Sequence, residues 1–320
     1  MENNKPIDLG KGISLIDGFD LGLSYRTGTY VIHEEELTLI ETGPSPSVPY
    51  ILQGLKELGY NPEDVRYIIV THIHLDHAGG AGLLLQSCKN AKVVVHPRGF
   101  KHLANPSRLI AGARAVYGSE FDSLFDPIIP IPEEQLIVKN DGDQLKIGEK
   151  CKLQFLDTPG HASHHFSIYD PVRNGIFTGD TVGMQYEWLK ELKINFHLPI
   201  TSPNQFNPDT MLQSIERVRS INVDSIYYGH FSMTNHVNDA LNQVVYWIEK
   251  FVKEGERLFK ENDSQTVLAS RLYELVQDYL LKRNVPEDHR IYPLLKQDME
   301  ICAMGILDYL NKHEKELTIY

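Results

Sequence analysis

The sequence predicts an α/β protein that ends in an all-helical region. Up to about residue 235, short apolar runs typical of strands alternate with loops rich in glycine and proline. Beyond that point, apolar residues recur every three or four positions, which is the period of a helix. At 320 residues the chain has about the length of two domains. We therefore expect an α/β domain over residues 1–235 and a helical region over residues 236–320.

Two sets of strands and helices follow one another within the α/β domain. The first set is predicted as strands at 30–32, 37–40, 67–70 and 92–95, with helices over 50–58 and through 83–85. The second set is predicted as strands at 152–156, 166–169, 175–178 and 225–228, with a helix that opens at Pro208 and Asp209. Two such sets predict two sheets that pack face to face with helices outside.

Three amphipathic helices account for the C-terminal region. Their apolar stripes run over 237–252, 268–279 and 294–310, and Asp263 and Ser264 are a cap signal before the second. Each helix must bury its stripe against another helix, the α/β domain or a second chain, so a homodimer stays open. Two long connecting stretches, 97–132 and 181–208, have the length of lids or pocket walls, but ordinary connections are an equal alternative.

Composition limits the partners of the protein. The 31 Lys and Arg against 43 Asp and Glu give a formal net charge of −12, and an acidic chain repels nucleic-acid backbones and anionic lipid. No apolar run approaches the ~20 residues of a membrane span, and the N-terminus lacks the apolar core of a signal peptide. Three scattered cysteines are too few for a disulfide framework. We expect a cytoplasmic protein with a small-molecule substrate and without nucleic-acid or membrane partners.

The strongest chemical signal is the sequence Thr-His-Ile-His-Leu-Asp-His at 71–77, directly after a predicted strand. On extended backbone, His72 and His74 point to the same side because alternate side chains share a face. Curvature at the strand end then brings Asp76 and His77 toward a neighbouring point. Imidazole nitrogens and carboxylates are good ligands for zinc and related divalent ions. The motif therefore predicts a metal site.

Later loops supply three further candidate ligands. His161, Asp180 and His230 each lie beside or near a glycine, just past a predicted strand. Loops at strand ends can converge on one cleft, although any one of these residues alone is weak evidence. Together with the first motif they strengthen the prediction of a metal centre.

Four motifs of the sequence resemble those of the metallo-β-lactamase superfamily in type, order and spacing. They are THIHLDH at 71–77, TPGH at 158–161, TGD at 178–180 and GH at 229–230. The resemblance implies an αββα metallo-β-lactamase-like sandwich as the catalytic domain, with the all-helical C-terminal region as an extension. The β-lactamase activity that names the superfamily is not expected, because those enzymes are typically exported.

The resemblance also implies a dinuclear metal site. The ligands that it implies are His72, His74 and His161 for one metal, Asp76, His77 and His230 for the second, and Asp180 as the bridge between both. Of these, Asp76 and Asp180 are expected to be catalytic as well. Zinc is the default for five imidazoles and two carboxylates, and iron or manganese accept the same set. Two divalent ions that share a water lower its pKa toward ~7, which yields hydroxide at neutral pH for attack on a carbonyl or phosphorus.

Some positions depart from the family pattern or leave their role open. The superfamily usually has Asp where this chain has Glu41, whose extra methylene changes the geometry from which it can hydrogen-bond a ligand histidine. His165 matches a histidine often found in the superfamily, and we expect it to form a supporting hydrogen bond. His197 is compatible with a substrate contact or a plain loop position. Lactonases of the superfamily use a tyrosine near the bridging Asp, and Tyr186 lies six residues past Asp180, which is too weak a match to assign it this role.

These observations favour a dinuclear metal hydrolase of a small ester, thioester or lactone. A glyoxalase II-like glutathione thioesterase is an alternative, because those enzymes pair the same ligands with a helical C-terminal domain. A ribonuclease Z-like nuclease or phosphodiesterase uses the same two-metal chemistry, but both parts of this chain are net negative. A non-enzymatic member would have lost ligands, and all seven positions are present. A diiron flavoprotein would typically carry Glu in place of His74.

Overall fold

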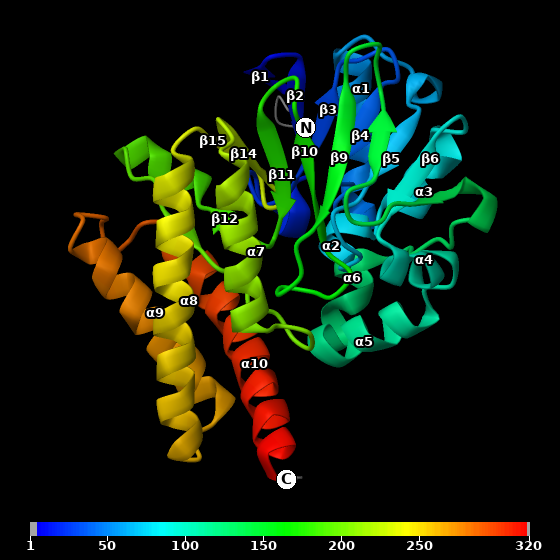
Figure 1. Cartoon of the computed structure of the whole chain (residues 1–320). Coiled ribbons are helices and arrows are strands. Elements are labelled where there is room, and N and C mark those ends of the chain that lie inside the picture. Colours follow the sequence, from blue (N-terminus) through cyan, green and yellow to red (C-terminus); the bar gives the residue numbers. More distant parts are fainter. Residues whose placement is uncertain (1–4, 319–320) are drawn as a thin grey trace. The chain divides into compact units, whose positions relative to one another are not determined.

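The computed structural model describes residues 5–318 (Figure 1). By their internal contacts, these residues form two compact units that are interleaved along the chain. Unit 1 comprises the described residues of Met1–Asp157, His164–Gly179 and Val223–Asn235, and unit 2 those of Thr158–Ser163, Asp180–Asn222 and His236–Tyr320. The predicted domains, 1–235 and 236–320, stay a prediction.

The first sheet of unit 1 has seven strands, which lie side by side in the order of the chain. They are β1 (Ile7–Gly10), β2 (Ile13–Asp17), β3 (Gly28–Ile32), β4 (Thr38–Ile40), β5 (Tyr67–Ile69), β6 (Lys92–Val95) and β7 (Leu136–Val138). Neighbours from β1 to β4 are antiparallel, and neighbours from β4 to β7 are parallel. Parallel neighbours need crossover connections, and these contain helices here.

Six helices of unit 1 lie in the crossovers of this sheet. They are α1 (Val48–Glu57) between β4 and β5, α2 (Leu75–Ala78) and α3 (Ala81–Ser87) between β5 and β6, and α4 (Pro97–Ala104), α5 (Ser107–Tyr117) and α6 (Phe121–Phe125) between β6 and β7. Short 3₁₀ turns complete the connections: η1 (Asp20–Gly22), η2 (Ser45–Ser47), η3 (Pro62–Asp64), η4 (Gly118–Glu120) and η5 (Glu133–Gln135).

The second sheet of unit 1 has six strands in the order β15-β14-β11-β10-β9-β8. Their bounds are β8 (Gln144–Lys146), β9 (Lys152–Asp157), β10 (Phe166–Asp170), β11 (Gly175–Gly179), β14 (Ser225–Tyr228) and β15 (Met233–Thr234). Only the pair β11 and β14 is parallel among these described strands. The residues that follow β11 and β14 therefore leave the sheet at the same edge.

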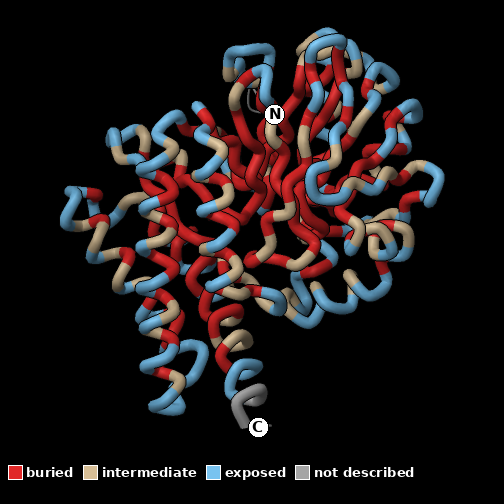
Figure 2. Tube along the Cα trace, in the orientation of Figure 1, coloured by how far each residue is buried: buried red, intermediate tan, exposed pale blue. Residues whose placement is uncertain are grey.

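Alternate side chains of the first sheet enter two different apolar cores. Tyr30 and Ile69 belong to a core that also contains Phe155 of the second sheet, so the two sheets share it. Val31, on the opposite face of β3, belongs to a core with Leu84 of α3. Burial on both faces explains the continuous apolar runs of these strands, and Figure 2 shows them buried along most of their length. The predicted face-to-face sheets are confirmed.

Unit 2 is mainly helical. Its elements are β12 (Met184–Gln185), η6 (Glu187–Leu192), β13 (His197–Leu198), α7 (Pro208–Ile221), α8 (Val237–Lys260), α9 (Gln265–Leu281) and α10 (Ile291–Thr318). Helices α8, α9 and α10 contact one another, which buries stripe residues such as Phe251, Leu272 and Met299. The three predicted C-terminal helices are therefore confirmed. Among residues 5–318, no helix combines the length and the apolar character that crossing a membrane requires.

The structure adds elements that the sequence patterns did not predict. Strands β1, β2, β7 and β8 extend the two sheets. The stretch 97–132 contains three helices, and the stretch 181–208 contains two short strands with a 3₁₀ turn between them. Both stretches thus contain regular segments as well as loop.

His197 on β13 is a fully buried histidine of unit 2. Its backbone N–H donates to Gln243 Oε1 on α8 at 3.2 Å. Burial lowers the pKa of His197 to about 3, and the nearby Lys190 and His236 add to the shift. The unfolded chain takes up this proton near pH 6.5, whereas the folded chain does not until about pH 3. The folded state therefore loses stability as the pH falls through this window.

We expect His197→Gln to make the free energy of unfolding less dependent on pH below 6.5. In the original protein, His197 should lower the free energy of unfolding by about 1.4 kcal/mol for each unit by which the pH falls between 6.5 and 5. Urea unfolding at about pH 7 and about pH 5 measures this difference. His313→Gln, which removes an exposed histidine of α10, is the control. The same pH difference in His197→Gln as in the control would contradict the prediction.

Candidate metal centre

The histidine-rich motif of unit 1 lies at the carboxyl end of β5. His72 lies in a bend after β5, His74 is on extended backbone, and Asp76 and His77 lie in α2, which begins at Leu75. His72 Nε2 lies 3.1 Å from His74 Nδ1. Two nitrogens on a tetrahedral zinc at ~2.0–2.1 Å are about 3.3 Å apart, so this spacing suits two ligands of one ion. The turn from strand to helix thus gathers the motif as its spacing predicts.

A second group of donor atoms forms around Asp76. Its Oδ2 lies 3.6 Å from His77 Nε2 and 3.5 Å from His230 Nε2. The donor atoms of these three residues all lie within 4.8 Å of one another, and both imidazoles are buried. A carboxylate and two imidazoles that converge in this way can hold a divalent ion. The residues present therefore fit a metal site.

A backbone carbonyl determines how His230 presents its ring. His230 Nδ1 lies 3.2 Å from the Arg26 carbonyl oxygen. A carbonyl only accepts hydrogen bonds, so Nδ1 carries the proton and the lone pair of Nε2 points toward Asp76. His230 follows β14 and Arg26 precedes β3, so the contact joins the two sheets of unit 1. No local sequence pattern singled out Arg26.

Glu41 supports the motif from the end of β4. It is buried, and its backbone adopts a left-handed conformation with φ 65°. Such a conformation costs a non-glycine residue about 1 kcal/mol or more. Glu41 Oε1 accepts a hydrogen bond from the Thr71 hydroxyl, and Oε2 lies 3.5 Å from His77 Nδ1. Glu41 thus reaches both Thr71 and a predicted ligand, His77.

Thr71 transmits this support to His72. Its hydroxyl donates its one proton to Glu41, so toward His72 Nδ1, at 3.1 Å, it can only accept. His72 therefore carries its proton on Nδ1 and turns Nε2 toward His74. Gly179 leaves room for this arrangement, because a Cβ there would lie 2.4 Å from Thr71 Oγ1 and 2.5 Å from His165 Nε2. His165 thus lies beside Thr71 in the same buried layer.

Unit 2 contains the other two predicted ligands. His161 Nε2 lies 3.4 Å from Asp180 Oδ2, and both side chains are buried. His161 Nδ1 donates to the Ile200 carbonyl at 2.9 Å, which again leaves the lone pair on Nε2. The Thr158 carbonyl accepts from the Thr181 hydroxyl at 2.6 Å, so the two ligand-bearing loops are bonded to each other.

The glycine of the TPGH motif has a steric reason. Gly160 has φ 127°, and a Cβ on it would lie 2.3 Å from the backbone nitrogen of Met211 in α7. Its carbonyl accepts from the Asn207 N–H at 2.8 Å. Only glycine allows this approach, which fixes the loop directly before His161.

The predicted ligands thus fall into two groups. Five of them, His72, His74, Asp76, His77 and His230, lie together in unit 1. His161 and Asp180 lie together in unit 2. One centre built from both groups, with Asp76 and Asp180 as catalytic residues, remains a proposal.

Two residues that are not predicted ligands, Tyr186 and Asp20, need an assignment. The Tyr186 hydroxyl donates to Asp298 Oδ2 at 2.7 Å in the interior of unit 2, so we do not assign Tyr186 to the substrate. Asp20 of unit 1 was not predicted. Burial raises the pKa of Asp20 to about 6, and the Asp76 carboxylate adds to the rise while Arg26 opposes it. Asp20 therefore belongs to the electrostatic surroundings of Asp76.

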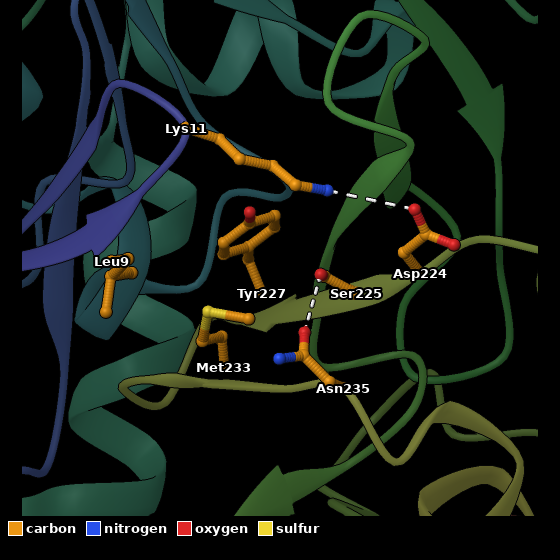
Figure 3. A pocket seen from close by; sticks show the side chains of 7 residues that line it. All are labelled: Leu9, Lys11, Asp224, Ser225, Tyr227, Met233 and Asn235. Atoms are coloured by element: carbon orange, nitrogen blue, oxygen red, sulfur yellow. Dashed lines mark hydrogen bonds and ion pairs between the residues drawn. The ribbon is translucent and has the colours of Figure 1, made fainter.

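A separate surface pocket of unit 1 has a volume of about 290 Å³ (Figure 3). It is lined by Leu9, Lys11, Asp224, Ser225, Tyr227, Met233 and Asn235. Lys11 Nζ lies 3.7 Å from Asp224 Oδ2, and both side chains are more than half exposed. An exposed ion pair of this kind contributes at most about 1 kcal/mol. None of the residues that line this pocket is a predicted ligand, and we assign the chemistry to the histidine clusters instead.

Comparison with known proteins identifies the family that this fold and these motifs represent. The model of the metallo-beta-lactamase superfamily matches residues 25–230. The chain belongs to the metallo-beta-lactamase superfamily. The predicted αββα metallo-β-lactamase-like sandwich with a helical C-terminal region is thereby confirmed. The fold of this superfamily holds dinuclear metal sites, and the superfamily includes metal-dependent hydrolases.

Individual members of the superfamily resemble the chain over different lengths. Diflavin flavoprotein A 1 of Synechocystis sp. is 24% identical over 73% of this chain and 39% of its own length. An N-acyl homoserine lactonase of Bacillus thuringiensis is 27% identical over 56% of this chain and 61% of its own length. The chain thus spans less than half of the flavoprotein and less than two thirds of the lactonase. The crystal structure of a metallo-beta-lactamase family protein from Thermus thermophilus shares the fold, with a TM-score of 0.68 at 18% identity over 96% of this chain and 95% of that chain.

We expect Glu41→Gln to lower the affinity for divalent metal about 10- to 100-fold with the fold retained. The amide lacks the negative charge that faces His77 Nδ1, and loss of such a supporting partner typically costs this much. Competition with a chelator measures the metal affinity, and circular dichroism checks the fold. Glu36→Gln, which removes a half-exposed glutamate paired with Arg66, is the control and should bind metal as the original protein does. Equal affinities in both variants would show that Glu41 does not support the site.

Proposed function

We propose that this chain is a dinuclear metal-dependent hydrolase of small esters, thioesters or lactones, with zinc as the metal. The proposed ligands are His72, His74 and His161 for one ion, Asp76, His77 and His230 for the other, and Asp180 as the bridge. The observation that carries the proposal is the convergence of Asp76 with the buried His77 and His230, whose donor atoms all lie within 4.8 Å of one another. When bound, two such ions supply Lewis acidity and a nucleophile at neutral pH.

The chain's own residues prepare this chemistry by fixing protons and charges. Nδ1 protons on His72, His161 and His230 are held by Thr71 Oγ1 and two backbone carbonyls, so each ring offers Nε2 as its metal-binding atom. Asp180 is buried beside His161 and supplies negative charge, which would reduce the repulsion between two bound cations. These roles need no movement of the side chains at the moment of reaction.

Among the three substrate classes, lactones have specific support. The N-acyl homoserine lactonase is 27% identical over 183 residues, against 24% over 249 residues for the flavoprotein. A lactone is a cyclic ester, so the same attack on a carbonyl serves it. The net charge of −12 disfavours polyanionic substrates such as RNA, which argues against the ribonuclease Z-like alternative.

A redox activity is the second candidate, because the diflavin flavoproteins match the longer part of the chain. Their match covers only 39% of the flavoprotein, so the activity of that whole protein does not transfer. Diiron flavoproteins typically carry Glu where this chain has His74, so the chain departs from their ligand pattern at this position. His74 therefore favours the hydrolase.

A substrate panel on metal-loaded protein tests the proposed function. The panel contains lactones, p-nitrophenyl esters, thioesters including a glutathione thioester, a phosphodiester and a structured RNA. We expect hydrolysis of at least one carbonyl substrate by the zinc-loaded protein. Oxygen consumption by iron-loaded protein, without hydrolysis of any carbonyl substrate, would replace the hydrolase with the redox candidate.

We expect Asp180→Ala to reduce the metal content from two ions per chain toward one. Each ion loses a ligand, and the negative charge between the two cations is removed. Turnover of the best substrate should fall about 10²- to 10³-fold with the fold retained. Elemental analysis after gel filtration measures the metal content. Asp224→Ala, which removes an exposed aspartate paired with Lys11, is the control. Two ions and unchanged turnover in Asp180→Ala would rule out its bridging role.

A further inference from the structure

Hydrogen bonds from successive turns of helix α10 join it to the segment 186–204. The helix and the segment both belong to unit 2. The Tyr186 hydroxyl donates to Asp298 Oδ2 at 2.7 Å, and both side chains are buried. The Thr201 hydroxyl is also buried and donates to the Cys302 carbonyl at 2.9 Å. The hydroxyl hydrogen bonds therefore attach both ends of this stretch to α10.

Gly305 shows how closely α10 approaches the segment. A Cβ built on Gly305 would lie 1.7 Å from the Thr201 carbonyl oxygen and 2.6 Å from its carbon. Glycine within a helix costs roughly 1 kcal/mol relative to alanine. The absent side chain at Gly305 is what allows the two backbones to touch. Any residue other than glycine at position 305 would therefore displace Thr201.

The segment held in this way carries the acceptor that orients His161. The Ile200 carbonyl accepts from His161 Nδ1 at 2.9 Å. On one side of Ile200, the Pro199 carbonyl lies 3.7 Å from the Cys302 sulfur, and on the other side Thr201 touches Gly305. The peptide unit that fixes the His161 ring is therefore flanked on both sides by contacts with α10.

We propose that Gly305 and Thr201 are positioning residues for His161, and that α10 is a supporting element of the metal centre rather than an appended helix. The inference rests on the proposed function, in which His161 is a ligand. α10 sets the position of the Ile200 carbonyl, and that carbonyl sets the tautomer and the direction of His161. A shift of the segment would turn Nε2 away from Asp180, which lies 3.4 Å from it.

Zn²⁺ affinity of the full-length protein is the first measurement, by competition with a chelator. We expect Gly305→Ala and Thr201→Val to weaken Zn²⁺ binding about 10- to 100-fold. Thr201→Ser keeps the hydroxyl and should restore the affinity. Gly112→Ala is the matched control in α5, because a Cβ on Gly112 meets no atom within 4 Å. Thr201→Val decides the question if Gly305→Ala fails to fold.

The tautomer of His161 in metal-free protein is the second measurement, and a purely structural role would not change it. Long-range ¹H–¹⁵N correlations of histidine-labelled protein report which ring nitrogen carries the proton, and His161→Gln assigns the signal. We expect the Nδ1–H form in the original protein and in Thr201→Ser. Gly305→Ala and Thr201→Val should show a mixture with the Nε2–H form.

Two outcomes separate this inference from the proposed function. Unchanged Zn²⁺ affinity in His161→Ala would overturn the ligand role, and with it the proposed function. Weakened affinity in His161→Ala, with original affinity and tautomer in both Gly305→Ala and Thr201→Val, would overturn the positioning role alone. Loss of affinity with the original tautomer would also overturn it, because α10 would then act by stability.

Discussion

The candidate centre depends on one kind of hydrogen bond, in which a fixed acceptor holds the Nδ1 proton of a buried histidine. The Arg26 carbonyl does this for His230, and the Ile200 carbonyl does it for His161. Thr71 does it for His72 because its own proton is committed to Glu41. A neutral imidazole has two tautomers and can turn either nitrogen toward a ligand, and these contacts select one combination before any ion arrives.

The sheet geometry explains where the polar residues of unit 1 lie. Glu41, the histidine motif and His230 follow β4, β5 and β14, and each of these strands has a parallel neighbour. Cores on both faces of the first sheet hold these strand ends in place. Rigid strands thus supply precision, while the polar groups that follow them supply chemistry.

The sequence predicted the places of the histidine motif and of His230 directly after β5 and β14, because the apolar runs of these strands are continuous, and the ligand role of both stays a prediction. It could not predict the conformation of Glu41 or the need for glycine at position 305, since each depends on residues far away along the chain. Helices α4 and α5 were missed because Pro97 and Pro106 resemble breaks, whereas one begins α4 and the other directly precedes α5. Strand β1 was missed because most of its residues are exposed.

The contact between Gly305 and Thr201 has a consequence for the order in which the protein forms during synthesis. A chain is made from its N-terminus, and its parts begin to fold as they emerge. Unit 1 ends at residue 235, so all of its residues exist before α10 does. Under the positioning role proposed for α10, the nascent protein passes through a stage in which the Asp76 cluster can assemble but His161 is not yet oriented. Helix α10, which is translated later, would then complete the centre, and metal loading would become a late step of maturation.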